Sequence, residues 1–216
     1  MKNRALFILI ALTAFCGTVL ATGQQPDRII YKGKEYRLNS NPLESYFKQF
    51  PDKRPKSGLV NTSLWRGYIA KFEVIDSSIF VVDISIEVYD KENKLKRKSV
   101  FDSVFPGQKA VRLDWFTGIL VLPYGNIVNY VHMGYASTFE NYILLAVHAG
   151  TVSKSRELDA NGYVQFRDKQ FEMFKKTPEY SALLKSLRDE GESIESMESF
   201  LKIYVIDYTA TFLDEP

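Results

Sequence analysis

The segment from Leu64 to Tyr89 constrains the fold most, because apolar residues recur at every second position along two long runs. Asp76, Ser77 and Ser78 separate the runs, and side chains of these types hydrogen-bond to nearby backbone in turns. A period of two is typical of strands, so we expect a β-hairpin with one buried face and one face in water. The expected buried face carries these residues: Tyr68, Ala70, Phe72 and Val74 in the first run, and Phe80, Val82, Ile84, Ile86 and Val88 in the second.

The first 21 residues have the pattern of a secretory signal peptide. Two basic residues precede an uncharged apolar run, Ala5 to Val19, and the predicted cleavage site follows Ala21. The run is short for a membrane span, which needs about 20 apolar residues. We therefore expect a periplasmic or secreted protein, with no membrane span in the mature chain. The alternative is a lipoprotein anchored at Cys16, which the bulky Phe15 in front of that cysteine disfavours.

Removal of the signal peptide changes the cysteine content and the charge of the chain. Cys16 is the only cysteine of the 216 residues, so the mature chain is expected to have no disulfide and no cysteine ligand. The signal contains two of the 28 basic residues and none of the 26 acidic ones, which leaves a net charge of zero. A neutral chain without basic tracts interleaved with aromatic residues gives no indication of nucleic-acid binding.

The mature chain is predicted to form one α+β domain from residue 28 to residue 216, after a flexible lead-in at residues 22–27. Hydrophobic residues make up 45% of the sequence and aromatic residues 14%, which favours a sheet-rich core. Residues 28–150 are predicted to be rich in strands. Residues 151–216 are predicted to be rich in helices.

Local patterns place the other elements of the sheet-rich part. A small hairpin is expected over Arg28–Leu38, with Gly33 in its turn. Pro42 is well placed at the start of a short amphipathic helix. Another strand is expected over Val111–Leu122, followed by a turn at Pro123–Asn126.

The C-terminal part begins with a polar stretch, residues 153–160, which we interpret as a linker. Two or three helices follow, and alternation over Lys202–Phe212 predicts a strand that returns to the sheet. The complete expectation is an antiparallel sheet of about six to eight strands. One short N-terminal helix and two or three C-terminal helices would pack on it.

Three stretches are similar to a group of uncharacterised bacterial proteins that share a domain of unknown function. They are Arg66–Glu73 (RGYIAKFE), Asp114–Gly118 (DWFTG) and Tyr130–Tyr135 (YVHMGY). The resemblance covers about Ile29 to Ala149 and implies one domain. No activity is assigned to that group, so the resemblance implies no catalytic residue.

Two sets of residues are candidates for catalysis by an envelope hydrolase. His132 is close in sequence to Glu140, and a histidine oriented by a carboxylate is a common general base. Asp83 and Glu87 share the wet face of the predicted hairpin, and paired carboxylates are the groups that a glycosidase uses. The simpler interpretations are a structural histidine in a loop and a solvated sheet face of mixed charge.

Metal and cofactor chemistry has no support in the sequence. The two histidines are His132 and His148, and without a cysteine in the mature chain they match no zinc spacing. Glycine-rich nucleotide-binding motifs are absent. We therefore expect no metal site and no cofactor.

Aromatic residues are the remaining candidates, because rings gathered on one face would form a docking surface for a protein or a glycan partner. The alternative is that most of these rings lie in the core. We expect a non-enzymatic binding or protein-interaction domain of the bacterial envelope, with the hydrolase as the alternative. The candidate binding residues are Trp65, Trp115, Tyr124, Tyr130 and Tyr135.

Overall fold

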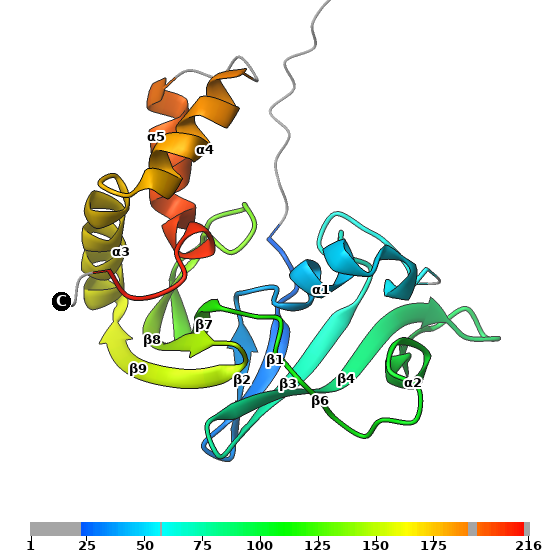
Figure 1. The fold of residues 1–216 in the computed structure, drawn as a ribbon. Helices are drawn as coiled ribbons and strands as arrows, with labels where there is room; N and C mark the ends of the chain where they lie inside the picture. The colour runs from blue at the N-terminus through cyan, green and yellow to red at the C-terminus, as the bar shows by residue number, and fades with distance from the viewer. Residues whose placement is uncertain (1–22, 57, 190–193, 214–216) are drawn as a thin grey trace, which may run out of the picture.

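The computed structural model of the chain describes residues 23–56, 58–189 and 194–213. The predicted signal peptide, residues 1–21, and the alternative anchor Cys16 lie outside these residues. The described residues form a mixed, mostly antiparallel sheet of nine strands with five α-helices (Figure 1). The predicted α+β class is confirmed, although the sheet has more strands than the six to eight expected.

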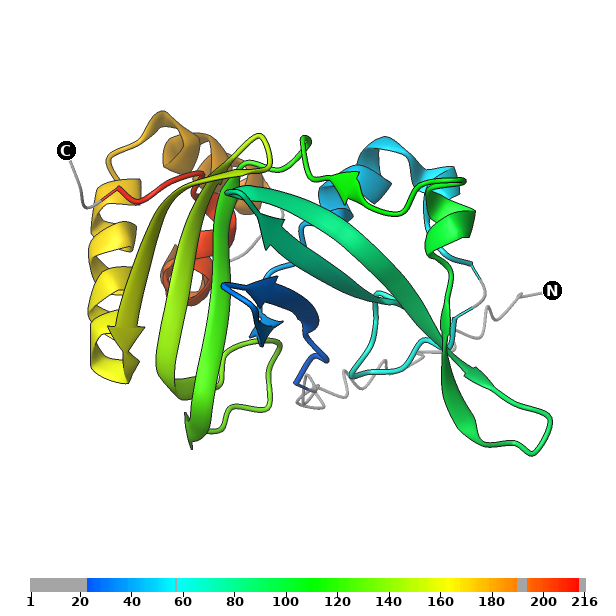
Figure 2. The same ribbon diagram turned by 90° about the horizontal axis from the view of Figure 1, so that it is seen from below.

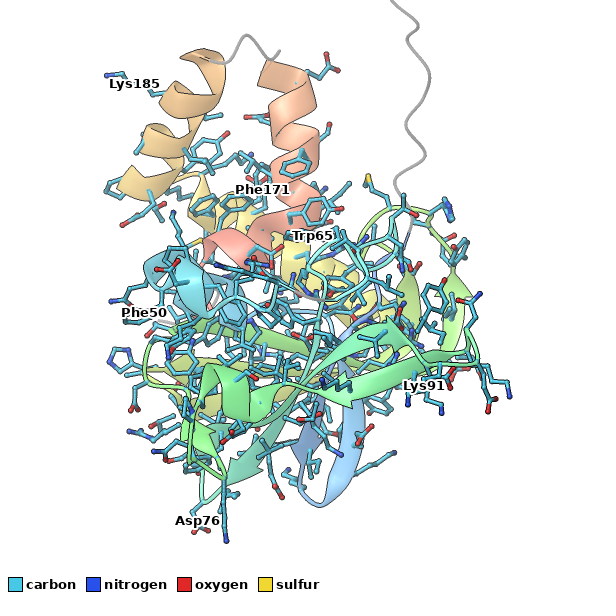
Figure 3. The ribbon with its side chains drawn as sticks, turned by 90° about the vertical axis from the view of Figure 1, so that its right-hand side faces the viewer. Phe50, Trp65, Asp76, Lys91, Phe171 and Lys185 are labelled. Atoms are coloured by element: carbon cyan, nitrogen blue, oxygen red, sulfur yellow. The ribbon has the colours of Figure 1, made fainter. Side chains whose placement is uncertain are left out.

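The first half of the sheet is built around β3 (Ile69–Ile75) and β4 (Ser78–Tyr89), which pair as the predicted hairpin. Asp76 lies in its turn, at the tip of the hairpin (Figure 3). β1 (Asp27–Tyr31) pairs in parallel with β3 and antiparallel with β2 (Lys34–Leu38). The small N-terminal hairpin is therefore a part of the same sheet.

A β-bulge in the central hairpin changes which face of β4 is buried. Phe72 lies opposite Val81 while the preceding Lys71 lies opposite Asp83, so Val82 has no partner. The alternation along β4 shifts by one residue at this point. Ile84 and Ile86 are buried as predicted. Phe80 and Val82 were predicted to be buried but are only half-buried, and Ile79 and Val81 lie in the core instead.

Two short strands, β5 (Leu95–Ser99) and β6 (Val111–Arg112), pair with different parts of β4. The predicted single strand over Val111–Leu122 is wrong, because the chain leaves the sheet after Arg112 and re-enters it at Gly118. There it begins β7 (Gly118–Asn129).

The second half of the sheet is an antiparallel set of β7, β8 (Thr138–His148) and β9 (Thr151–Asp159). β7 passes through Pro123–Asn126, so the predicted turn is wrong. The register shifts between Tyr124 and Ile127, which shows that the backbone bulges there without leaving the sheet.

The two halves of the sheet enclose a common core (Figures 1 and 2). Ser78 of β4 and Thr151 of β9 are the one paired position that joins the halves on one side. On the other side, the amide N of Asn39 after β2 donates to the carbonyl O of Val121 on β7, at 2.8 Å. The sheet thus curls until its two end strands meet.

The first half of β7, residues 118–123, and residues 142–147 of β8 are buried on both faces, which explains their continuous apolar runs. Alternate residues of each strand point into the space between the two halves of the sheet. The others point outward, into a second core beneath the C-terminal helices. The inward set is Leu120, Leu122, Ile143, Leu145 and Val147, and the outward set is Ile119, Val121, Tyr142, Leu144 and Ala146.

Two short helices cover the core between the two halves of the sheet, which we call the first core. α1 (Leu43–Gln49) buries Leu43 and Phe47 there and is followed by a 3-10 turn, η1 (Pro51–Lys53). The one-turn helix α2 (Phe101–Val104) packs on the same core.

The C-terminal helices cover the outer face of β7 and β8. α3 (Ala160–Phe174) begins at Asp159, whose side chain accepts a hydrogen bond from the amide N of Gly162 at 2.7 Å. α4 (Pro178–Asp189) and α5 (Ile194–Tyr204) rise from the sheet as a helical pair, and η2 (Val205–Tyr208) follows (Figure 1).

Three further predicted features differ from the structure. The strand over Lys202–Phe212 is absent there, because the end of α5 and η2 occupy most of it and bury Leu201 and Val205 at a helical spacing. Residues 153–160 are mostly β9, because backbone pairing with β8 holds this polar stretch. The described part of the lead-in, residues 23–27, is fixed, since the amide N of Gln25 bonds to the carbonyl O of Ser63 at 2.7 Å.

Candidate ligand-binding site

A cavity of about 320 Å³ lies where the outer face of the β1–β2 hairpin meets the far ends of β7 and β8. Residues 23–26 and Arg97 of β5 complete its rim. Its charged side chains are all arginines, and the described residues that line it include no aspartate or glutamate. The residues that characterise it are Arg28, Arg37, Arg97, Ile127, Tyr130 and Phe139.

Two of the arginines face each other across the N-terminal hairpin. Lys32 and Gly33 form the two-residue turn, and this register places Arg28 directly opposite Arg37. Like charges at directly opposite positions destabilise a sheet. Within the described residues neither arginine has an ion pair. Burial, and then the positive charge of Arg28, lower the pKa of Arg37.

The third arginine differs, because carboxylate and amide groups already bind it. Arg97 Nη2 donates to Gln25 Oε1 at 3.1 Å and lies 3.7 Å from Glu87 Oε1. The uncompensated positive charge of the cavity is therefore concentrated at Arg28 and Arg37.

The opposite wall of the cavity is apolar and comes from a second cross-strand pair. Ile127 of β7 lies opposite Phe139 of β8, and both line the cavity. The guanidinium carbon of Arg37 lies 5.4 Å from the centre of the Phe139 ring, within cation–π range. The basic and apolar walls therefore meet at these two side chains.

The bulge in β7 immediately precedes Ile127 and sets its position in this wall. Gly125 adopts a positive φ of 82°, and a Cβ there would lie 2.5 Å from Glu140 Oε2. The Glu140 carboxylate accepts hydrogen bonds from the amide N of Asn126 at 2.9 Å and from its Nδ2 at 3.1 Å. These bonds lower the pKa of Glu140. The glycine and the carboxylate together hold the bulge.

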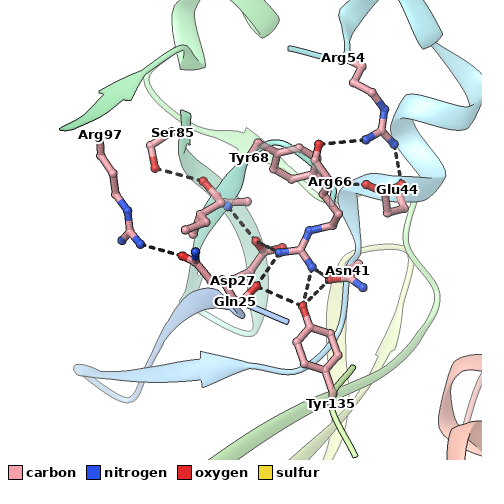
Figure 4. A network of polar contacts seen from close by, with 12 residues as sticks. Gln25, Asp27, Asn41, Glu44, Arg54, Arg66, Tyr68, Ser85, Arg97 and Tyr135 are labelled. Carbon is pink, nitrogen blue, oxygen red and sulfur yellow. Dashed lines mark hydrogen bonds and ion pairs between the residues drawn. The ribbon is translucent and has the colours of Figure 1, made fainter. Parts of the chain in front are cut away.

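A buried ion pair contacts residues that line the cavity (Figure 4). Arg66 Nη2 and Asp27 Oδ1 are 3.1 Å apart, and their side chains are 1% and 0% exposed. Arg66 also donates to the carbonyl O of Gln25 at 3.0 Å and to the hydroxyl of Tyr135. Because Gln25 and Tyr135 line the cavity, Arg66 holds two of its lining residues in place.

The carboxylate of this pair has an altered affinity for protons. Burial raises the pKa of Asp27 to about 6, against the opposing effect of Arg66. Asp27 Oδ1 accepts a hydrogen bond from the amide N of Ala70 at 2.9 Å, whereas its Oδ2 has no partner. The Nε of Arg66 is likewise buried without a partner.

The structure does not join the predicted catalytic residues His132 and Glu140. His132 is exposed, and its Nδ1 lies 2.7 Å from the hydroxyl of Tyr130. Glu140 is bonded to Asn126 instead, as described above. No described contact connects the histidine with a carboxylate.

The predicted carboxylate pair is also separated. Asp83 and Glu87 lie four residues apart on β4, which is about 13 Å along a strand. Glycosidase carboxylates are about 5 to 9.5 Å apart. Asp83 accepts a hydrogen bond from Ser99 Oγ at 2.5 Å, and Glu87 is near Arg97, so each acid has a separate partner.

Two of the five predicted binding aromatics converge on the cavity, namely Tyr130 and Tyr135. Trp115 packs against the first core and donates from Nε1 to the carbonyl O of Pro42 at 3.1 Å. Tyr124 packs edge-on against Tyr36, Trp65 is 52% exposed, and neither is a lining residue of the cavity.

Sequence reasoning missed the arginines. A signal was present for two of them, because a hairpin turn at Lys32 and Gly33 pairs Arg28 with Arg37 by counting outward from the turn. No comparable signal existed for Arg97 or for the Asp27–Arg66 pair, since these contacts join distant parts of the chain.

Within the described residues, neither a metal site nor a membrane-spanning helix is present. No group of three or more histidine, cysteine, aspartate or glutamate side chains there could hold a metal ion. None of the helices in that part of the chain has the length and apolar character needed to cross a membrane.

Comparisons with protein-family models, with curated proteins and with solved structures find no match to this chain. The resemblance to uncharacterised bacterial proteins therefore stays a prediction.

Proposed function

We propose that this chain is an exported, non-enzymatic binding protein of the bacterial envelope, and that its ligand is a small anion held in the arginine-lined cavity. The observation that carries the proposal is the Arg28–Arg37 pair. Two guanidinium groups share one cavity wall, and within the described residues neither forms an ion pair with a carboxylate.

Physical chemistry favours an anion as the missing partner. Guanidinium groups present a planar fork of N–H donors that matches carboxylate, sulfate and phosphate oxygens. A bound anion would also relieve the repulsion across the hairpin. The cavity volume of about 320 Å³ is at the lower end of the range for small-molecule sites, which favours a compact ligand.

Isothermal titration calorimetry at low salt tests the proposal, with hexanoate, acetate and inorganic phosphate as probes. At least one of these anions is expected to bind with one site per chain. The variants Arg28→Gln and Arg37→Gln should each weaken binding by about tenfold or more, because each removes a charged hydrogen-bond donor. Lys34→Gln is the matched control, a charge removal on the same hairpin outside the cavity lining.

Two results would contradict the proposal. One is the absence of heat with every anion. The other is binding that Arg28→Gln, Arg37→Gln and Lys34→Gln weaken equally, which would assign the effect to general charge.

The alternative function, an envelope hydrolase, predicts a different result. Turnover of a nitrophenyl ester or glycoside would have to depend on His132, Glu140, Asp83 or Glu87. We expect no turnover that disappears in His132→Ala, because no described contact joins this histidine to a carboxylate.

A further inference from the structure

We propose that the ligand is an amphiphilic anion with one anionic head group and a short apolar body. This inference rests on the proposed function and specifies its ligand class. The head group would bind between Arg28 and Arg37, and the apolar body would lie against Ile127 and Phe139.

A single head group follows from the distribution of charge. Arg97 is already near Glu87 at 3.7 Å and bonds to Gln25 at 3.1 Å. Of the three arginines that line the cavity, Arg28 and Arg37 have no ion pair within the described residues. One anionic group matches one such wall, whereas a polyanion would need a second uncompensated cluster on the rim.

An apolar body follows from the facing wall. Ile127 is 48% exposed although it is a large aliphatic residue, and it lies at the cavity opposite the buried Phe139. The β7 bulge, held by Gly125 and Glu140, fixes its position. Ile69 of β3 adds a further apolar surface to the lining. An ion without an apolar part would leave this wall in contact with water.

The head group and the body are adjacent because Arg37 is common to both walls. Its guanidinium carbon lies 5.4 Å from the centre of the Phe139 ring. The positive charge that would bind the head group is therefore adjacent to the apolar surface. A carboxylate on a short alkyl chain or on a single ring has this arrangement of groups.

The test compares three probes on four proteins by isothermal titration calorimetry. Hexanoate has head and body, acetate has the head alone, and hexylamine has the body with the opposite charge. The proteins are the wild type, Arg37→Gln, Ile127→Ser and the control Val128→Ser. Val128 neighbours Ile127, is 60% exposed and lies outside the cavity lining.

Hexanoate is expected to bind at least about tenfold more tightly than acetate, from the burial of its additional methylene groups. Hexylamine should not bind. Ile127→Ser should weaken hexanoate binding about three- to tenfold and leave acetate binding unchanged. Val128→Ser should leave both unchanged, and Arg37→Gln should weaken both.

The two proposals fail in distinguishable ways. If acetate and hexanoate bind equally and Ile127→Ser has no effect, while Arg37→Gln still weakens both, the amphiphilic ligand is wrong and the anion site remains. If Arg37→Gln has no effect on any probe, the anion site itself is wrong.

A membrane lipid shares this chemistry, so one further measurement distinguishes the sources. Phosphatidylglycerol vesicles are sedimented with wild type and with Arg37→Gln. We expect no sedimentation that depends on Arg37, because a cavity of about 320 Å³ is small for a two-chain lipid. Loss of co-sedimentation in Arg37→Gln would contradict a free small ligand and assign the site to a lipid head group.

Discussion

Arg28 of β1 lies directly opposite Arg37 of β2, at the wall of a cavity whose described lining contains no carboxylate. Lys71 is the neighbour of Arg28 on the other side, on β3, and forms its own ion pair with Glu35 at 2.7 Å. The repulsion between Arg28 and Arg37 therefore remains, and it opposes folding.

Removal of one of these charges should stabilise the protein in the absence of ligand. Arg28→Gln is expected to raise the free energy of unfolding by a few tenths of a kcal/mol, up to about 1 kcal/mol, because like charges directly opposite destabilise a sheet. Urea denaturation at low salt measures the change. The gain should shrink in about 1 M salt, where charges are screened. A less stable variant at low salt would show that Arg28 has a partner that stabilises it.

Breaking the Asp27–Arg66 pair should have the opposite effect. Arg66→Met leaves the carboxylate buried beside an apolar side chain and is expected to cost about 3–5 kcal/mol of stability. The double variant Asp27→Leu/Arg66→Met should recover much of this loss, since no buried charge remains. Urea denaturation measures the stability of the single and the double variant. Arg97→Met is the control, because it removes an arginine whose side chain is half-exposed. Equal losses of stability in Arg66→Met and Arg97→Met would show that the burial of the Asp27–Arg66 pair does not determine the cost of breaking it.

Stability should also depend on the protonation of Asp27. Its pKa is raised from 3.8 to about 6 in the folded protein, so the folded state binds more protons than the unfolded state between these values. The stabilisation that comes from protonated Asp27 is therefore fully present below about pH 4. It is lost as the pH rises through 6. Carboxyl carbon NMR should show a midpoint near 6 for this residue, and Asp27→Asn should lack the corresponding loss of stability. A midpoint below 3.8 would reverse the sign and contradict the prediction.

The bulge in β7 provides a further test. Gly125→Ala combines an unfavourable positive φ with a Cβ contact to Glu140, and we expect a loss of about 1–3 kcal/mol of stability with weaker hexanoate binding. Gly107→Ala is the control, because Gly107 has a positive φ of 71° but nothing within 4 Å of the added Cβ. Thermal denaturation and calorimetry compare the two. Equal effects on binding would show that the bulge does not position Ile127.

Local sequence patterns were sufficient for the strands that keep a regular alternation. The hairpin of β3 and β4 was predicted from its period of two, and the turn at Lys32 and Gly33 fixes the pairing of β1 with β2. The bulge at Val82 was not predictable in the same way. A single unpaired residue reverses the faces of a strand without changing its composition, so Val81 is buried in place of Val82.

The C-terminal segment shows the same limit for helices. Residues 202–212 alternate in hydrophobicity over a few positions, yet Val205 and Ile206 belong to η2 and are buried in the second core beneath the C-terminal helices. A short apolar pattern is compatible with both periods, and the surface on which it packs decides between them.

The sequence by itself was sufficient for the strand-rich centre and for the N-terminal hairpin, whose turn at Lys32 and Gly33 sets Arg28 against Arg37. The export signal is a prediction from the sequence and lies outside the described residues. Only the tertiary structure decided that β5 and the ends of β7 and β8 surround this pair and that Asp27 meets Arg66. The physical reason is that local pattern governs backbone hydrogen bonding between neighbouring strands. A site is made by side chains that the curling of the whole sheet brings together from distant positions.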